Sequence, residues 1–302
     1  MRIALTGATG FVGGHVVDAA LAAGHEVVAL TRRAQEPRDR VEWVAGSLED
    51  GASLAKLIKG ADAVIHIAGV ISEAERGGFE QGNVVGTRAV LAAAEATAVE
   101  RFVHVSSLAA REPKLSRYGA SKARSEDLVA ASPLSRAIVR PPALYGPGDR
   151  EMLELFKMAA RGVIVLPPKA ARLSLLHVAD LARLLVALAD SAAPTGATFE
   201  PDDDHRGGWS QAEFGAALGI AVGRKSLAIH APAPLMKLAA LADRAVRGKR
   251  AKLTPDRATY FAHPDWVADS IRTVPPALWT PQIELTQGLA DTAAWYRAAG
   301  WL

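Results

Sequence analysis

The amino-acid sequence predicts an α/β fold, a doubly wound parallel sheet with a smaller, mostly helical C-terminal lobe. Up to about residue 140, short runs of β-branched residues alternate with longer Ala-rich segments of helical period, which is the rhythm of βαβ units. The apolar runs are nearly continuous, as is typical of strands that helices cover on both faces. After Arg140 prolines interrupt this rhythm, and helix-like segments dominate.

The elements of the first part follow in a regular order. Strands are expected at residues 3–6, 27–31, 41–45, 64–67, 102–106 and 137–140. Between them, segments 12–23, 54–59, 83–98 and 118–131 carry good helix formers with polar residues on one side. Six strands in this order favour a doubly wound sheet.

The remaining chain is expected to form the second lobe. We place a nucleotide-binding type of domain at 1–190, with an excursion into the second lobe near 146–172, and the lobe itself at 191–302. Ser210, with Glu213 three positions later, predicts a capping box at the start of a helix. Residues 289–296 are expected to form a final helix.

Composition excludes several classes of protein. The 302 residues hold 35 Lys and Arg against 32 Asp and Glu, a formal charge of +3, which is too small to indicate nucleic-acid binding. The chain has no Cys, which excludes disulfides, zinc–thiolate sites and iron–sulfur clusters. The spacing of its eight His does not favour a metal site. Neither a signal peptide nor a membrane span is predicted, and we expect a cytoplasmic protein.

A glycine turn follows the first strand. Gly7, Gly10 and Gly13 lie between the strand and the first helix. Gly7 would permit a tight turn, Gly10 would let a diphosphate approach the backbone, and Gly13 would let helix and strand pack closely. This context predicts a Rossmann-type dinucleotide site, although an ordinary glycine-rich turn is the alternative.

The end of the second strand bears on the choice of dinucleotide. An NAD site usually has an acid here that binds the ribose hydroxyls, but this chain reads Thr31-Arg32-Arg33. Because arginine binds phosphate with two parallel hydrogen bonds, we predict NADP(H) in preference to NAD(H). The alternative is that both arginines are simply solvated loop residues.

Tyr118 and Lys122 are the candidate catalytic pair. They are four residues apart on a predicted helix, so both side chains share one face. A phenol has a pKa of about 10, and a nearby ammonium favours the phenolate, which suits general acid–base chemistry. Ser106 and Ser107 lie at the carboxyl end of the fifth strand, where ligands bind in open α/β sheets.

Seven segments of the chain together form a highly specific set of sequence motifs. They are TGATGFVG at 6–13, HIAG at 66–69, NVVGT at 83–87, HVSS at 104–107, YGASK at 118–122, RPPALYGPGD at 140–149 and LLHVADLA at 175–182. With them, nearly the whole chain resembles the short-chain dehydrogenase/reductase superfamily, in its extended, NAD-dependent epimerase/dehydratase branch.

The resemblance implies roles for individual residues. Ser107, Tyr118 and Lys122 would form the catalytic triad, and Asn83 would support the active site. The full set expected at the cofactor is Gly7, Thr9, Gly10, Phe11, Val12, Gly13, Thr31, Arg32, Arg33, Ser47, Leu48, Ala68, Gly69, Tyr118, Lys122 and Pro141.

Three positions depart from the pattern of the family. Ser47 stands where many relatives have an Asp that contacts the adenine. Ser107 lies only 11 positions before Tyr118, so the loop over the nicotinamide is expected to be short, and Ser106 remains an alternative catalytic hydroxyl. Ala143 stands where sugar-nucleotide epimerases commonly carry an Asn. The chain thus looks more like relatives of dihydroflavonol reductase and 3β-hydroxysteroid dehydrogenase, which act on less polar substrates.

The main hypothesis is an NADP(H)-dependent oxidoreductase that transfers hydride between nicotinamide and a carbonyl or alcohol substrate. A nucleotide-sugar epimerase or dehydratase is the second hypothesis, because it would use the same triad. A catalytically idle nucleotide-binding sensor or assembly subunit is the third. The intact Tyr118 and Lys122 favour an enzyme.

Two further expectations concern partners. Residues 235–252 join an apolar helix face to Arg244, Arg247, Lys249, Arg250 and Lys252. We favour a helix packed into the second lobe with a solvated basic end, and contact with an anionic membrane surface is the alternative. Relatives often dimerise through the helices expected at 83–98 and 118–131, so a homodimer is an expectation by analogy.

Overall fold

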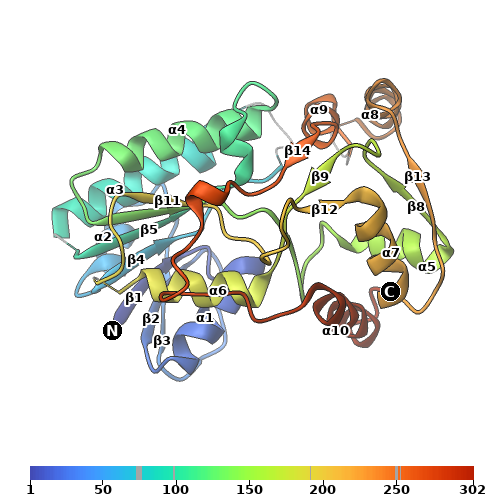
Figure 1. Ribbon diagram of the computed structural model, residues 1–302. Coiled ribbons are helices and arrows are strands. Elements are labelled where there is room, and N and C mark those ends of the chain that lie inside the picture. The colour runs from blue at the N-terminus through green and yellow to red at the C-terminus, as the bar shows by residue number, and fades with distance from the viewer. Residues whose placement is uncertain (73–76, 98, 191, 249–250, 252) are drawn as a thin grey trace. The chain divides into compact units, whose positions relative to one another are not determined.

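The computed structural model describes residues 1–302 except 73–76, 98, 191, 249–250 and 252 (Figure 1). The chain forms two compact units. The first, called here the sheet unit, comprises 1–141, 181–200 and 272–280; the second unit comprises 142–180, 201–271 and 281–302. The sequence predicts a first domain at 1–190 with an excursion near 146–172, whereas in the structure the excursion spans 142–180 and residues 191–200 and 272–280 also belong to the first unit. One reason is that a short strand after residue 190, Ala197–Phe199, joins the first unit's sheet.

A seven-stranded parallel sheet forms the centre of the sheet unit. Its strand order is β11-β6-β5-β4-β1-β2-β3 (Figure 1). The order reverses between β1 and β4, and ligands bind at such a switch point beyond the carboxyl ends of the strands. The strands are β1 (Arg2–Thr6), β2 (Glu26–Thr31), β3 (Val41–Ala45), β4 (Ala63–His66), β5 (Arg101–Val105), β6 (Arg136–Val139) and β11 (Ala197–Phe199). The predicted doubly wound α/β fold is confirmed, with β11 as one strand more than expected.

Helices cover both faces of this sheet. The apolar side chains of α2, α3 and α4 pack with Val28, Val64 and Phe102 in one core, while Figure 1 shows α1 on the opposite face. The elements are α1 (Phe11–Ala22), α2 (Gly51–Ile58), η1 (Glu80–Val85), α3 (Gly86–Thr97), η2 (Leu108–Arg111), α4 (Arg117–Ala131), α6 (Val178–Leu188) and η4 (Ser270–Arg272). Both α6 and η4 continue across a boundary between the units.

One helix of the sheet unit begins differently from expectation. The segment predicted as a helix over 83–98 starts within a π-helical turn, η1, and continues as α3; residue 98 lies outside the described residues. The wider turn buries Asn83 and Val84. π-Helical turns of this kind occur frequently at functional sites.

The second unit has its own core and short sheets. Tyr145, Phe156, Phe214 and Tyr296 are buried at its centre. The strands are β7 (Ala143–Tyr145), β8 (Val163–Leu166), β9 (Arg172–Leu173), β10 (Leu175–His177), β12 (Trp209–Ser210), β13 (Leu227–His230) and β14 (Asp265–Trp266). The helices are α5 (Leu153–Arg161), α7 (Gln211–Ala221), α8 (Ala233–Arg247), α9 (Pro255–Phe261) and α10 (Leu285–Ala298). The Ser210–Glu213 capping box is present at α7.

The helix expected after residue 235 forms as α8 and contacts α9, and Arg244 and Arg247 at its end are exposed as expected, but its apolar side is not buried in the second unit. Of its 15 residues only Ala240 is buried, and Leu235, Leu238 and Leu241 are exposed. A helical period shows that one side is apolar but not which way that side faces. Lys249, Arg250 and Lys252 of the same prediction lie outside the described residues. Within the described chain, the helices are all too short or too polar to cross a bilayer.

Candidate active site

The glycine turn lies between β1 and α1. Gly7 has φ +78°, and a Cβ there would lie 2.8 Å from Ala68 N. A Cβ on Gly13 would lie 2.0 Å from Gly7 O, so α1 rests directly on the turn. Gly10 caps α1 without a side chain, and both Thr9 and Gly10 are exposed. Bare backbone N–H groups at a helix N-terminus suit a diphosphate, so this turn fits the expected dinucleotide.

The end of β2 carries two exposed arginines. Thr31 Oγ1 donates to Arg33 O at 2.7 Å and accepts from Arg33 N at 3.2 Å, which fixes the turn that presents Arg32 and Arg33 to solvent. Glu49 approaches from the segment after β3. A hydrogen bond from the Ser47 side chain is the main cause that lowers the pKa of Glu49, and the charge of Arg32 adds to it.

The remaining expected cofactor residues also follow strand ends. Ser47 and Leu48 come after β3, Ala68 and Gly69 after β4, and Pro141 after β6. Ala68 N donates to Thr6 Oγ1 at 3.2 Å, and Pro141 O accepts from Leu108 N at 3.1 Å. The structure therefore brings the predicted set to the carboxyl edge of one sheet.

Lys122 is fixed beneath this edge. The residue is only 5% exposed, and its Nζ donates to the carbonyl oxygen of Val105, the last residue of β5, at 2.7 Å. Burial lowers the pKa of Lys122 to about 8, although the Glu126 carboxylate acts in the opposite direction. A buried ammonium next to a strand end can donate to a ligand hydroxyl and favour a nearby phenolate.

Tyr118 lies one turn before Lys122, in the first turn of α4. Ser116 caps this helix by accepting from Gly119 N at 2.9 Å. The Tyr118 ring is half-buried and lies 5.7 Å from the ring of Phe79. The i, i+4 spacing keeps Tyr118 on the same face as Lys122.

The two candidate serines have different surroundings. Ser106 is buried, and its hydroxyl donates to Glu126 Oε1. Ser107 is half-buried and caps η2, where its Oγ accepts from Ala109 N at 3.2 Å. An oxygen that accepts from a backbone N–H keeps its own proton for a ligand. The contacts therefore favour Ser107 over Ser106 as the hydroxyl that meets the substrate.

Ser106 hydrogen-bonds to a buried cluster of charged side chains. The sequence analysis did not predict this cluster. Glu126 accepts from Arg140 Nη2 at 2.6 Å, and Arg140 Nη1 donates to Glu200 at 3.0 Å. Glu200 is 1% exposed and also pairs with Arg111 at 3.3 Å. Burial opposes the charge of Arg140, but Glu126 and Glu200 raise its pKa above the ordinary value. The signal in the sequence is Glu126, four residues after Lys122 on the same face of α4.

Asn83 joins two of the segments around the site. Its Oδ1 accepts from Val70 N at 2.6 Å, while its Nδ2 donates to Val70 O and to Ser121 Oγ, both at 2.9 Å. The loop after β4 is thereby tied to α4 between Tyr118 and Lys122. A Cβ on Gly69 would lie 2.9 Å from Asn83 Oδ1, so this loop packs closely on the amide.

Two neutral histidines lie below the site. His66 and His104 are paired in register on β4 and β5, and their rings stack at 5.4 Å. Burial and the charge of Lys122 lower the pKa of His66 to about 3 and that of His104 well below its usual range. Neither ring therefore titrates near neutrality, and both stay uncharged beside the Lys122 ammonium.

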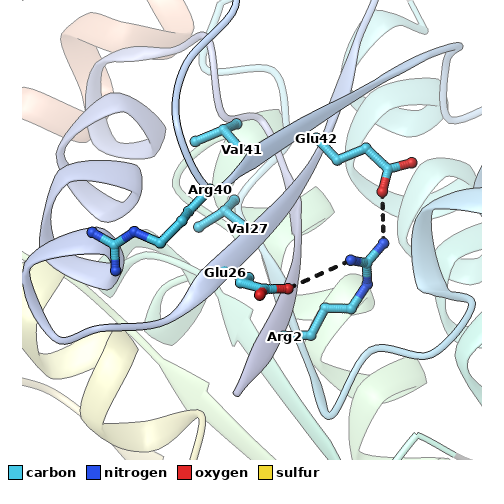
Figure 2. Close-up of a pocket in the computed structure, with 6 residues that line it drawn as sticks. All are labelled: Arg2, Glu26, Val27, Arg40, Val41 and Glu42. Atoms are coloured by element: carbon cyan, nitrogen blue, oxygen red, sulfur yellow. Dashed lines mark hydrogen bonds and ion pairs between the residues drawn. The ribbon is translucent and has the colours of Figure 1, made fainter.

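Figure 2 shows a shallow pocket that belongs to the opposite edge of the sheet. Arg2, Glu26, Val27, Arg40, Val41 and Glu42 line it, at the amino ends of β1, β2 and β3. Arg2 pairs there with Glu42 at 2.7 Å and with Glu26 at 3.8 Å. Because ligands of open α/β sheets bind at the carboxyl ends, this pocket is not the candidate active site.

Comparison with known proteins decides the family. The sequence profile of the NAD dependent epimerase/dehydratase family matches residues 3–200. The chain belongs to this family. It is therefore an NAD(P)-dependent enzyme of the oxidoreductase or epimerase/dehydratase type, and the resemblance seen in the motifs is confirmed.

Curated relatives and a solved structure extend this result. The chain is 40% identical to a ceramide reductase of Caulobacter vibrioides, over 99% of this chain and 96% of the relative. It is 38% identical to a putative dihydroflavonol 4-reductase of Synechocystis, over 35% of this chain and 32% of the relative. The structure of MoeE5 in complex with UDP-glucuronic acid and NAD superposes with a TM-score of 0.76 at 22% identity and covers 99% and 100% of the two chains; it shows the fold alone.

Proposed function

We propose that this family member is an NADP(H)-dependent reductase that converts a ketone on a long-chain, apolar substrate into a secondary alcohol. The observation that carries the proton chemistry of the proposal is the position of Lys122, which is buried and held by the carbonyl of Val105 at 2.7 Å, one turn from Tyr118. The choice of a reductase rests on the similarity along the whole chain to a ceramide reductase. This arrangement serves proton transfer at the carboxyl edge of β5.

Tyr118, Ser107 and Lys122 have different roles in the proposed reduction. When bound, the reduced dinucleotide would supply the hydride that adds to the carbonyl carbon of the ketone. Tyr118 donates its phenolic proton to the carbonyl oxygen as that oxygen becomes an alkoxide, and Ser107 donates a hydrogen bond to the same atom. Lys122 stabilises the phenolate that remains on Tyr118, which later regains a proton from water.

The preference for NADP(H) is supported by the end of β2. Arg32 and Arg33 are exposed there, and the strand ends on Thr31 rather than on an acid. Two guanidinium groups at this place suit the 2′-phosphate. Glu49, which lies near Arg32, would be displaced from it or would share it with the phosphate.

The substrate class is supported by similarity along the whole chain. The ceramide reductase matches 99% of this chain, the second unit included. A ceramide is an N-acylated long-chain amino alcohol, so we propose that the substrate is the corresponding amino ketone with its acyl chain. Ala143, in place of the Asn common in sugar-nucleotide epimerases, supports the same choice.

The test compares two substrates with two dinucleotides. We expect the purified protein to consume NADPH with an N-acylated long-chain amino ketone, and to leave UDP-glucose unchanged in the presence of NAD. Tyr118→Phe should reduce turnover by about a thousandfold, since a positioned general acid contributes roughly 10²–10⁴. Its affinity for NADPH should be unchanged.

Three results would contradict the proposal. Conversion of the UDP-sugar with retained NAD would favour an epimerase. Saturable NADPH binding without turnover across a panel of ketones would favour an idle sensor. Full activity of Tyr118→Phe would exclude the assigned proton donor.

A further inference from the structure

Helix α8 presents its apolar side to solvent. Leu235, Leu238, Leu241 and Val246 are 55%, 62%, 57% and 83% exposed. At 100° per residue these four side chains fall within an arc of about 140°. Ala240, on the other side of the helix, is fully buried. α8 is thus amphipathic in the reverse sense to a helix that packs on a core.

The strand before α8 exposes apolar side chains as well. Leu227 and Ile229 of β13 lie opposite Val163 and Val165 of β8 in the ladder, and all four are exposed. Only Ala231 and Pro232 separate β13 from α8. In the described part of the chain, eight of the thirteen exposed large apolar residues lie in β8, β13 and α8. We call these eight residues the apolar surface of the second unit.

Basic side chains border this surface. Lys237 and Arg244 are exposed and follow Leu241 around α8 at the edge of its apolar arc. Arg247 pairs with Asp243 at 3.2 Å, and Lys225 is exposed next to β13. Apolar residues on one face with Lys and Arg beside them are the pattern of helices that lie in a membrane interface and bind anionic lipids.

We propose that the apolar surface of the second unit docks on a bilayer that contains anionic lipids. The leucines would enter the boundary between headgroups and acyl chains, while Lys237 and Arg244 would contact lipid phosphates. With 15 residues, α8 is about 22 Å long, which is too short to span a hydrocarbon core of roughly 30 Å, so it lies along the surface. Docking through this surface does not depend on the proposed reaction.

Vesicle sedimentation tests this surface directly. The full-length protein is mixed with vesicles of phosphatidylcholine alone, or with an equal share of phosphatidylglycerol, and the bound fraction is measured over a range of salt. We expect the protein to bind the anionic vesicles and the bound fraction to fall as salt is added. At physiological ionic strength, salt largely screens the attraction between exposed charges that are more than about 8 Å apart.

Matched variants separate the contribution of the apolar side chains to vesicle binding from that of the basic side chains. Leu235→Glu/Leu238→Glu should abolish binding, whereas Ile271→Glu, at a residue 90% exposed outside the apolar surface, should leave it unchanged. Lys237→Gln/Arg244→Gln should weaken binding by about 30-fold, at about 1 kcal/mol for each basic residue. Arg206→Gln is the control for charge. All changed residues are exposed, so circular dichroism should report an intact fold.

Two results would contradict docking on a bilayer. A wild-type protein that stays in the supernatant with anionic vesicles at low salt would overturn the proposal. So would Leu235→Glu/Leu238→Glu converting a dimer to a monomer without any vesicle binding by the wild type, since the apolar surface would then be an interface between two copies.

Discussion

Contact with Glu126 distinguishes the two serines that follow β5. The Glu126 carboxylate accepts from Ser106 and from Arg140, so Ser106 belongs to a buried charge cluster, whereas Ser107 is half-buried beyond the strand. We expect Ser107→Ala to lower kcat about a hundredfold and Ser106→Ala to lower it less than tenfold. The measurement is steady-state ketone reduction by both variants. A larger loss in Ser106→Ala would reverse the assignment.

Glu126 itself can be tested through stability. In Glu126→Gln the guanidinium of Arg140 keeps Glu200 as its partner, while one buried charge pair is lost. We expect a fall in the free energy of unfolding of about 2 kcal/mol, below the roughly 3–5 typical when a buried charge is left alone. Urea denaturation measures it, and Asp127→Asn, an exposed neighbour, is the control. An unchanged midpoint would show that the cluster contributes little.

Lys122 predicts how dinucleotide binding depends on pH. Its pKa of about 8 lies below the ordinary value because the ammonium is buried, so the side chain is charged below pH 8 and loses its charge above it. We propose that the Lys122 ammonium donates to a ribose hydroxyl of the dinucleotide. The affinity for NADPH should then fall as pH rises from 7 to 9.5, since the neutral amine is a weaker donor to that hydroxyl. Fluorescence titration measures the Kd. A Lys122→Met variant should show weak, pH-independent affinity; a wild-type Kd that stays constant would contradict the assigned contact.

At the scale of elements, the turn after β2 is where we expect a preference between the two dinucleotides to arise. Thr31 holds this turn, and Arg32 and Arg33 leave it on the solvent side. We expect Arg32→Ala/Arg33→Ala to raise the Kd of NADPH by at least about 150-fold while that of NADH changes less than threefold, since each lost hydrogen bond to a charged group contributes about 1.5–3 kcal/mol. Arg38→Ala, an arginine paired with Asp18 in the following segment, is the control. Equal losses for both dinucleotides would exclude a 2′-phosphate contact.

The elements also show which parts of the fold the sequence could predict. The glycine turn and the Tyr118–Lys122 spacing are local patterns, and the structure places them as expected along the chain. The pairing of β11 with β6 joins residues about 60 positions apart, and the Arg140–Glu200 ion pair depends on that pairing. No local pattern encodes such contacts. The outward face of α8 escaped prediction for another reason, because an inward and an outward stripe have the same period.

At the scale of the whole molecule, the expected cofactor residues all belong to the sheet unit. Every one of them lies in 1–141, so the dinucleotide should stabilise that unit by mass action, independently of the reaction. At a concentration 100 times its Kd, NADPH should raise the free energy of unfolding by about 2.7 kcal/mol.

Urea denaturation with and without NADPH measures this gain across variants. Tyr118→Phe should keep the full increment, because it removes a proton donor and leaves the glycine turn intact. Gly10→Val should lose most of the increment, because the side chain would stand where the diphosphate approaches the backbone. Its Cβ would lie 3.2 Å from Gly7 O, a tight contact, so the increment is measured against the same variant without NADPH, which already includes the cost of that contact. An increment retained in Gly10→Val would place the dinucleotide elsewhere, and its loss in Tyr118→Phe would show that the phenolic hydroxyl contributes much of the affinity for the cofactor as well as transferring the proton.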